Sequence, residues 1–306
     1  MTVSRRNFVK VVSGGLMAGL TLPFPAKVPP GWMVTRRESD FTLLRRNVGI
    51  FTARGGTMGW LVNDGGILVV DAQYPDTAGT FLEGLPGRAN RAMDVLINTH
   101  HHADHTAGNE VLRSEVRGIV AHRRARELHE ASGSDGPPRG LADTAFTREW
   151  RMPIGDERVM ARHLGPAHTG GDCTVHFAEA NVVHLGDLVF NRAYPFIDRA
   201  AGGSVRGWVE ILGTLEGEAD GDTRFIFGHA REGFGVTGDR TDLRVQSDFL
   251  QALLDEADRA IREGRSRDEL LAVEVIPGFP DHRPIAPRLS AGLALATAFD
   301  ELSEEG

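Results

Sequence analysis

The chain has 306 residues, of which 41% are hydrophobic and 25% charged, so it is long enough for one large domain or two small ones and has the composition of an ordinary globular protein. Its formal net charge of −8 argues against nucleic acid or anionic lipid as the main partner, because both reward a basic face. Cys173 is the only cysteine, which excludes an intramolecular disulfide.

The N-terminus has the layout of an export signal. Residues 4–10 (S-R-R-N-F-V-K) are basic, and an apolar run follows at 11–22. That run of about 12 residues is too short for a membrane helix, which needs roughly 20. The segment resembles a twin-arginine signal peptide with Arg5 and Arg6 as the recognised pair. We expect residues 1–26 to be this signal.

Export would place the mature protein in the periplasm or outside the cell, without an integral membrane segment once the signal is cleaved. No A-x-A cleavage pattern is present near Ala26, so an uncleaved anchor and a disordered basic tail stay open as alternatives.

After a polar, basic lead-in at 27–46, the first half of the chain predicts strands that alternate with short helices. N-D-G-G at 63–66 is a strong hairpin signal. The continuous apolar run at 93–99 is typical of a strand that is covered on both faces. Strands are expected at 48–52, 58–62, 67–71, 93–99 and 118–122, and helices at 76–90, 107–117 and 123–130.

The second half repeats this pattern. The segment 245–263 has apolar residues at helical spacing, which predicts an amphipathic helix. Two β-rich halves with flanking helices predict an α+β fold, in which two sheets form a sandwich with helices outside. We expect residues 27–306 to form one such domain. Strands are expected at 158–164, 173–177, 181–185 and 224–229.

The residues from His100 to His105 read H-H-H-A-D-H, directly after the strand expected at 93–99. His100 and His102 are two residues apart, and in extended backbone such side chains point the same way, so they can hold one metal ion. Asp104 and His105 follow where the chain turns into a helix. Imidazole and carboxylate ligands together suit Zn²⁺, and also Fe or Mn.

Three later motifs add candidate ligands. His168 lies in the glycine-rich stretch G-P-A-H-T-G-G-D, Asp187 follows the apolar run at 181–185, and His229 ends the run F-I-F-G-H. Each motif adjoins a predicted strand, so all three can meet at one edge of the sheets.

The ordered set H-x-H-x-D-H, A-H-T-x-G-D, G-D and G-H resembles the metallo-β-lactamase-fold hydrolase superfamily over about residues 45–235. The resemblance implies a four-layer αββα sandwich and a dinuclear metal site of two Zn²⁺ ions, with Fe or Mn as alternatives. It implies that Asp71 supports the metal-binding loop and that Asp104 orients the nucleophile. The implied ligands are His100, His102 and His168 for the first ion, Asp104, His105 and His229 for the second, and Asp187 as the bridge.

Other residues of interest match no ligand motif. His101 is expected to face outward or to support the ligands, and Cys173 is expected to be a small buried hydrophobe. Tyr194, Pro195 and Phe196 are expected either to floor a substrate pocket or to belong to the core. Structural or surface roles are expected for His122, His129, His163, His176, His184 and His282.

The resemblance implies a metal-dependent hydrolase with a small-molecule substrate that carries an ester, thioester, lactone or related bond. The bridging aspartate is typical of the glyoxalase II-like branch. Three alternatives stay open: a β-lactamase that hydrolyses β-lactams, a mononuclear iron sulfur dioxygenase, and a non-catalytic binding protein with a vestigial site. Fold alone does not decide among them.

Overall fold

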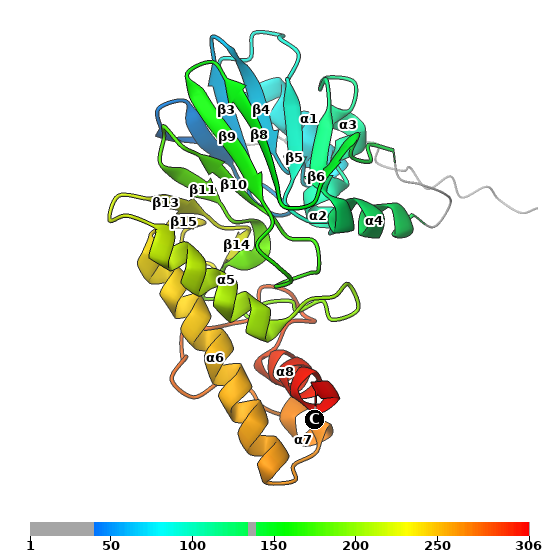
Figure 1. Cartoon of the computed structure of the whole chain (residues 1–306), viewed down its shortest axis with the longest axis vertical. Coiled ribbons are helices and arrows are strands. Elements are labelled where there is room, and N and C mark those ends of the chain that lie inside the picture. The colour runs from blue at the N-terminus through cyan, green and yellow to red at the C-terminus, as the bar shows by residue number, and fades with distance from the viewer. Residues whose placement is uncertain (1–39, 134–138, 306) are drawn as a thin grey trace, which may run out of the picture. The chain divides into compact units, whose positions relative to one another are not determined.

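The computed structural model in Figure 1 describes residues 40–133 and 139–305. The signal peptide expected at 1–26 lies outside these residues. Within them, two β-sheets pack face to face, and helices cover the outer face of each sheet.

The first sheet has seven strands, which follow one another in chain order. Strands β1 to β4 form an antiparallel meander, and β4 to β7 run parallel. Asn63 closes the predicted hairpin between β3 and β4, because its Oδ1 accepts the backbone N–H groups of Gly65 and Gly66 at 2.9 and 3.0 Å. The strands are β1 (Phe41–Arg45), β2 (Val48–Phe51), β3 (Met58–Asn63), β4 (Gly66–Val70), β5 (Val95–Asn98), β6 (Ile119–His122) and β7 (Thr144–Phe146).

The second sheet has six strands in the order β15-β13-β11-β10-β9-β8. Its neighbours are antiparallel except β11 and β13, which are parallel. A separate parallel pair, β12 with β14, lies near the metal-ligand candidates. The strands are β8 (Glu149–Ile154), β9 (Glu157–Arg162), β10 (Thr174–Phe177), β11 (Val182–His184), β12 (Phe190–Asn191), β13 (Arg224–Ile226), β14 (His229–Ala230) and β15 (Thr237–Gly238).

The helices connect the strands and follow them at the C-terminal end. They are α1 (Pro75–Gly84), α2 (Ala103–Thr106), α3 (Asn109–Leu112), α4 (Arg123–Ala131), the short 3₁₀ helix η1 (Gly186–Leu188), α5 (Val205–Glu218), α6 (Arg240–Arg262), α7 (Arg267–Leu271) and α8 (Ala291–Glu305). None of the helices that the structure describes is both long and apolar enough to cross a membrane.

Three hydrophobic clusters separate four layers. Strand β5 shows how the layers arise, because its neighbouring side chains point to opposite faces. Val95 and Ile97 enter the cluster between the two sheets, whereas Leu96 packs outward with Phe81 of α1. The predicted strand covered on both faces is therefore confirmed.

The third cluster lies on the outer face of the second sheet. Val183 and Phe225 of this sheet pack there with Trp208 of α5 and Leu253 of α6. The order of layers is helix, sheet, sheet, helix, which confirms the expected α+β fold and its four-layer αββα sandwich.

Two sequence expectations need correction. The lead-in is expected to reach residue 46, but Phe41–Arg45 forms β1, an edge strand that pairs with β2. Of the helix expected at 107–117, only the short helix α3 (Asn109–Leu112) forms, and another short helix, α2 (Ala103–Thr106), precedes it. Gly108 lies between them, so close to the chain that a Cβ there would lie 2.0 Å from the carbonyl oxygen of Ala72.

Helix α5 is not among the elements expected from the sequence, although Trp208, Leu212 and Leu215 recur at helical spacing. Glycines at 207, 213 and 217 lower its intrinsic helix propensity. Contacts with the second sheet and with α6 supply the stability that propensity does not.

Candidate metal centre

Four segments that are far apart in the sequence meet where strands of both sheets end. The loop after β5 carries His100 and His102, and leads into α2. His168 lies in the glycine-rich loop between β9 and β10. Asp187 is in η1 after β11, and His229 begins β14 after β13. Because β11 and β13 are parallel, the residues that follow them emerge at the same edge of the sheet.

His100, His102, His168 and Asp187 form the first group of candidate ligands, with one ligand atom of each lying within 4.8 Å of the others. His168 Nε2 is 2.9 Å from His102 Nδ1. The nearer oxygen of Asp187 is 3.5 Å from His168 Nε2 and 3.8 Å from His100 Nε2.

Asp104, His105 and His229 form the second group. His229 Nε2 lies 3.1 Å from Asp104 Oδ2. Asp187 also faces this group, with Oδ1 at 3.0 Å from His105 Nε2 and Oδ2 at 3.4 Å from His229 Nε2. The structure thus brings all seven predicted residues together and places Asp187 between the two groups.

Gly228 makes room for Asp187. A Cβ at position 228 would lie 1.9 Å from Asp187 Oδ1, so any residue larger than glycine would clash with this carboxylate. The glycine in F-I-F-G-H is therefore needed for the close approach of the two segments.

The outward-facing ring nitrogens fix the orientation of four histidines. His105 Nδ1 lies 2.8 Å from Asp71 Oδ2, and His168 Nδ1 lies 2.6 Å from the carbonyl oxygen of Phe196. His102 Nε2 lies 2.9 Å from Asp198 Oδ2. These oxygen partners accept hydrogen bonds, so each outward nitrogen carries the proton.

The outward nitrogen of His100, Nδ1, also carries a proton, because it donates to the hydroxyl oxygen of Thr99. The Thr99 hydroxyl donates to Asp71 Oδ2 at 2.8 Å, and its oxygen therefore accepts the N–H of His100 Nδ1 at 3.1 Å. Asp71 Oδ1 also accepts the Thr99 backbone N–H at 2.8 Å. The structure thus places Asp71 beneath the loop, where the sequence resemblance expects it, with a positive φ of 62°.

A neutral imidazole with its proton outward presents a bare lone pair inward. The Nδ1 of His102 and Nε2 of His168 face each other in this way at 2.9 Å. Further, the inward Nε2 of His100 is buried without a hydrogen-bond partner among the described residues. Lone pairs and carboxylate oxygens that converge at these distances repel one another unless cations lie between them. The donor set therefore fits metal ions.

The two groups differ in charge when no metal is bound. Burial lowers the pKa of His168 to about 3 and that of His100 well below its usual range. Burial also acts to lower the pKa of His229, but the charge of Asp187 and the hydrogen bond with Asp104 outweigh it and raise this pKa to about 9. Near neutral pH, the rings of His100 and His168 are therefore neutral, whereas the ring of His229 carries a positive charge.

A cavity of about 680 Å³ opens onto the candidate metal centre. Phe190, Phe196 and Leu289 provide apolar walls, and Arg54 and Arg288 provide positive charge. The Arg54 guanidinium lies 4.0 Å over the ring of Tyr74, and that of Arg288 lies 5.3 Å over the ring of Phe196.

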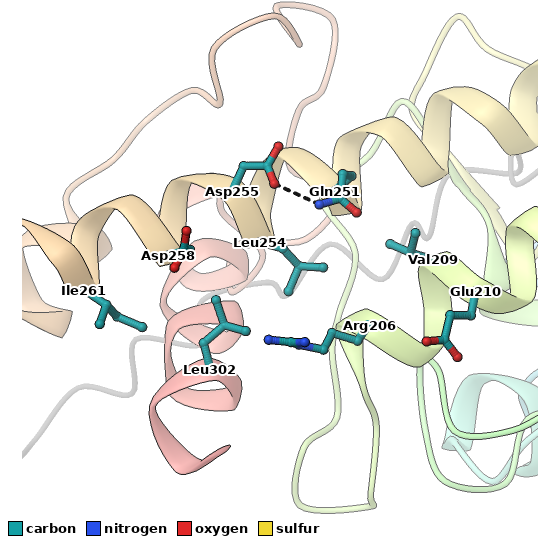
Figure 2. Close-up of a pocket in the computed structure, with 9 residues that line it drawn as sticks. All are labelled: Arg206, Val209, Glu210, Gln251, Leu254, Asp255, Asp258, Ile261 and Leu302. Atoms are coloured by element: carbon teal, nitrogen blue, oxygen red, sulfur yellow. Dashed lines mark hydrogen bonds between the residues drawn. The ribbon is translucent and has the colours of Figure 1, made fainter. Parts of the chain in front are cut away.

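A second hollow lies among α5, α6 and α8, and Figure 2 shows its lining. Its volume is about 470 Å³, and its lining residues include Arg206 and the acids Glu210, Asp255 and Asp258 but no histidine. It therefore lacks the nitrogen donors that distinguish the metal centre.

Other sequence expectations have mixed outcomes. Phe196 lines the cavity, whereas Tyr194 is buried in the core with its hydroxyl donating to the Glu274 carbonyl oxygen. Cys173 is buried between the sheets, as expected. His101 faces Asp198, with 3.9 Å between His101 Nε2 and Asp198 Oδ2. Outside both groups lie His122, His129, His163, His176, His184 and His282.

Sequence reasoning missed Asp198, Arg54 and Arg288. These residues lie outside the histidine and aspartate motifs, in segments without a recognisable pattern. Only the folded chain brings them to the cavity.

Comparisons with known proteins find relatives among hydrolases. Among curated proteins, the hydroxyacylglutathione hydrolase of Methylococcus capsulatus is 26% identical over 236 residues, which is 77% of this chain and 86% of that protein. The hydroxyacylglutathione hydrolase of Cereibacter sphaeroides is 33% identical over 127 residues, or 39% of this chain. That second match spans only 46% of the relative.

Solved structures show the same fold. A metallo-β-lactamase from Pontibacter korlensis superposes with a TM-score of 0.59 at 20% identity, covering 69% of this chain and 98% of that one. A double mutant of a sec-alkyl sulfatase superposes with a TM-score of 0.66 at 14% identity, covering 86% of this chain and 50% of that one.

The family model of the metallo-beta-lactamase superfamily matches residues 52–255, a range that contains all seven candidate ligands. With the four-layer sandwich and the converging histidines and aspartates, this match identifies the chain as an enzyme, a metallohydrolase that belongs to the metallo-β-lactamase superfamily.

Proposed function

We propose that this protein is a dinuclear zinc hydrolase that cleaves a thioester, with esters and lactones as related substrates. The position of Asp187 between the two groups carries the proposal. Its Oδ1 faces His105 Nε2 at 3.0 Å, and its Oδ2 faces His168 Nε2 at 3.5 Å. A carboxylate placed in this way can give one oxygen to each of two ions.

In this proposal, Asp187 bridges the ions. Nitrogen and carboxylate ligands suit zinc, and iron or manganese accept the same donors. When bound, the two ions would lower the pKa of water toward neutrality and polarise the carbonyl of the substrate. The ligands are His100, His102 and His168 for one ion and Asp104, His105 and His229 for the other.

Asp104 is the residue proposed to orient the attacking water. It lines the cavity, and its side chain is 26% exposed, whereas that of Asp187 is only 4% exposed. Burial acts to raise the pKa of Asp104, but the charge of His105 and the hydrogen bond from His229 lower it to about 2. In the metal-free protein the carboxylate is therefore ionised. With the ions bound, it would accept a hydrogen bond from water, whose proton would end on the leaving sulfur or oxygen.

The chain's own cysteine does not supply a nucleophile. Cys173 is buried, and burial raises the pKa of its thiol well above the usual range. Attack by water is therefore the route that these residues support.

The curated relatives support a thioester as the substrate, because their names describe hydrolases of hydroxyacylglutathione. A second candidate is β-lactam hydrolysis. The likeness to a metallo-β-lactamase structure favours it, although at 20% identity that likeness concerns the fold.

Metal analysis combined with a substrate panel tests the proposal. The purified protein is expected to contain two zinc ions per chain, and chelation is expected to abolish activity that zinc then restores. The panel contains thioester, ester, lactone, sulfate-ester and β-lactam compounds, and the thioester is expected to be cleaved fastest.

Three results would overturn this proposal in different ways. One tightly bound iron with oxygen consumption would indicate the sulfur dioxygenase. Faster cleavage of a β-lactam would indicate a lactamase. Two bound zinc ions without hydrolysis of any compound would indicate a binding protein.

A further inference from the structure

His102 has a different kind of hydrogen-bond partner from the other candidate histidine ligands. His100 and His105 are both oriented by Asp71, directly or through Thr99, and His168 by a backbone carbonyl. His102 instead faces Asp198, a carboxylate 96 residues further along the chain.

His102 also has less packing to hold it. Its side chain is 18% exposed, whereas those of His100 and His168 are each 1% exposed. Phe196 contacts its ring, with 5.4 Å between ring centroids. A ring that borders the cavity in this way can rotate unless a hydrogen bond restrains it.

Asp198 is held in place by hydrogen bonds that do not involve His102. Its backbone N–H donates to the carbonyl oxygen of His168 at 3.0 Å, and its own carbonyl oxygen accepts the N–H of Gly203 at 2.8 Å. Its Oδ1 accepts the backbone N–H of Ala201 at 3.0 Å, which leaves Oδ2 aimed at His102 Nε2 at 2.9 Å. The carboxylate is thus anchored to the same loop that carries another candidate ligand.

We propose that Asp198 is a positioning residue that holds the His102 ring with its Nδ1 lone pair toward the first metal ion. This inference rests on the proposed function. A carboxylate that accepts the outward N–H of a metal-binding histidine fixes the tautomer and the ring orientation and makes the inward nitrogen a better donor.

Another arrangement of the same atoms conflicts with this one. His101, His102 and Asp198 also lie close enough to hold an ion of their own. That ion would need the lone pair of His102 at Nε2, but a neutral imidazole has only one unprotonated nitrogen. His102 Nδ1 already faces His168 Nε2 at 2.9 Å, so the single lone pair belongs to the first group.

Zinc binding to Asp198 variants of the full chain tests the inference. Competition with a chromophoric chelator measures the affinity of each site, and the absorption spectrum after cobalt substitution reports the ligand geometry. Asp198→Ala is expected to lower the affinity of one site by about 10- to 100-fold and to change the cobalt spectrum. Both ions should still bind at saturating zinc.

Asp198→Asn guards against a variant that fails to fold, because it keeps the size of the side chain. An amide has one acceptor oxygen, whereas Asp198 satisfies two N–H groups with two oxygens. Either His102 or Ala201 loses its partner, so this variant is expected to lose affinity at the same site.

Glu301→Gln is the matched control. Glu301 is buried and accepts the Val205 backbone N–H at 2.7 Å and the Ser204 hydroxyl at 2.9 Å. It therefore stabilises the adjoining segment without contacting His102. Its substitution is expected to leave both zinc affinities and the cobalt spectrum unchanged.

The outcomes separate the inference from the proposed function. Wild-type affinities and spectrum in both Asp198 variants would overturn the inference, as would equal losses in Glu301→Gln. A third zinc equivalent in the wild type that is lost in Asp198→Ala would replace it with a separate metal site. If the wild type itself bound no more than one ion, the proposed dinuclear function would fail, whatever the variants showed.

Discussion

At the scale of single residues, the centre depends on where each proton lies. Asp71, Asp198 and the carbonyl of Phe196 accept protons on the outer side of the rings, so lone pairs and carboxylates converge on the inner side. Asp187 is the residue on which both groups depend, because each of its oxygens lies near a histidine nitrogen.

Substitution of Asp187 is therefore expected to lower the number of metal ions bound per chain from two to one or none. In Asp187→Asn, the amide nitrogen carries hydrogens and cannot donate a lone pair to a metal. We expect the loss of at least one zinc per chain and a fall in its affinity of more than about 100-fold, beyond the effect typical of residues that only support a ligand. Near-neutral kcat should fall with it.

Metal analysis of the dialysed variant and a kcat–pH profile measure these effects. Two retained ions with normal activity would refute the bridging role. Asp172→Asn is not a suitable control because Asp172 anchors the His168 loop through Thr169. Asp222→Asn is a suitable control, because Asp222 is exposed and forms an ion pair with Arg45, and neither residue belongs to the two groups of candidate ligands.

Metal uptake is expected to depend on pH in different ways at the two groups. In the metal-free protein, the pKa of His229 is raised to about 9, so this ring must lose a proton before it binds an ion. The metal affinity of the second group should therefore rise with pH below about pH 9 and level off above it. Burial lowers the pKa of His100 and lowers that of His168 to about 3, so these two rings need not lose a proton to bind an ion above pH 5.

Titration of the metal-free protein with zinc at pH 6 and pH 8.5 checks this expectation. One tight equivalent is expected at pH 6 and two at pH 8.5, with protons released only during binding of the weaker one. Equal uptake at both pH values would contradict the assignment of the bound protons to the second group.

At the scale of elements, helix packing supports the second sheet, from which Asp187 and His229 emerge. Helix α6 buries Leu243, Phe249, Leu250 and Leu253 in the cluster that also contains Phe225 of β13. Its N-terminus is capped by Asp239, whose side chain accepts the Thr241 backbone N–H at 2.7 Å. The site thus rests on the core that α6 shares with the second sheet.

Removing part of this core is expected to affect stability and not metal binding. Leu253 is fully buried, so Leu253→Ala should lower the free energy of unfolding by about 2–5 kcal/mol through lost transfer energy and a cavity. Ile261 is on the same helix but 39% exposed, and Ile261→Ala should have a much smaller effect. Urea unfolding of the zinc-loaded proteins measures the difference.

Zinc content serves as the second measurement for these two variants. Both are expected to keep two ions per chain. A loss of zinc in Leu253→Ala at temperatures where it remains folded would show that α6 positions the ligands, which contradicts a purely structural role.

At the scale of the whole molecule, export is a prediction from residues outside the described part of the chain. Arg5 and Arg6 precede a short apolar run, the arrangement of a twin-arginine signal. Changing both to Lys is expected to leave the protein in the cytoplasm without altering its fold. Fractionation of cells that express either form measures this, and delivery of the variant to the periplasm at the wild-type level would refute the signal.

The sequence alone predicts the elements and the candidate ligands whose evidence is local. The apolar run at 93–99 predicted a two-faced strand, and the residues from His100 to His105 predicted ligands after it, because strand periodicity and neighbouring imidazoles are properties of adjacent residues. The later motifs at His168, Asp187 and His229 were recognisable because they formed an ordered set.

The support of those candidate ligands and their surroundings arise only when distant parts of the chain fold together. Asp198 has no motif of its own and reaches His102 because its turn is hydrogen-bonded to the His168 loop. Arg288 joins Phe196 at the cavity wall from the segment that precedes α8. Helix α5 is stable because it packs against α6, despite its glycines. These outcomes depend on contacts between distant segments, and no local periodicity encodes such contacts.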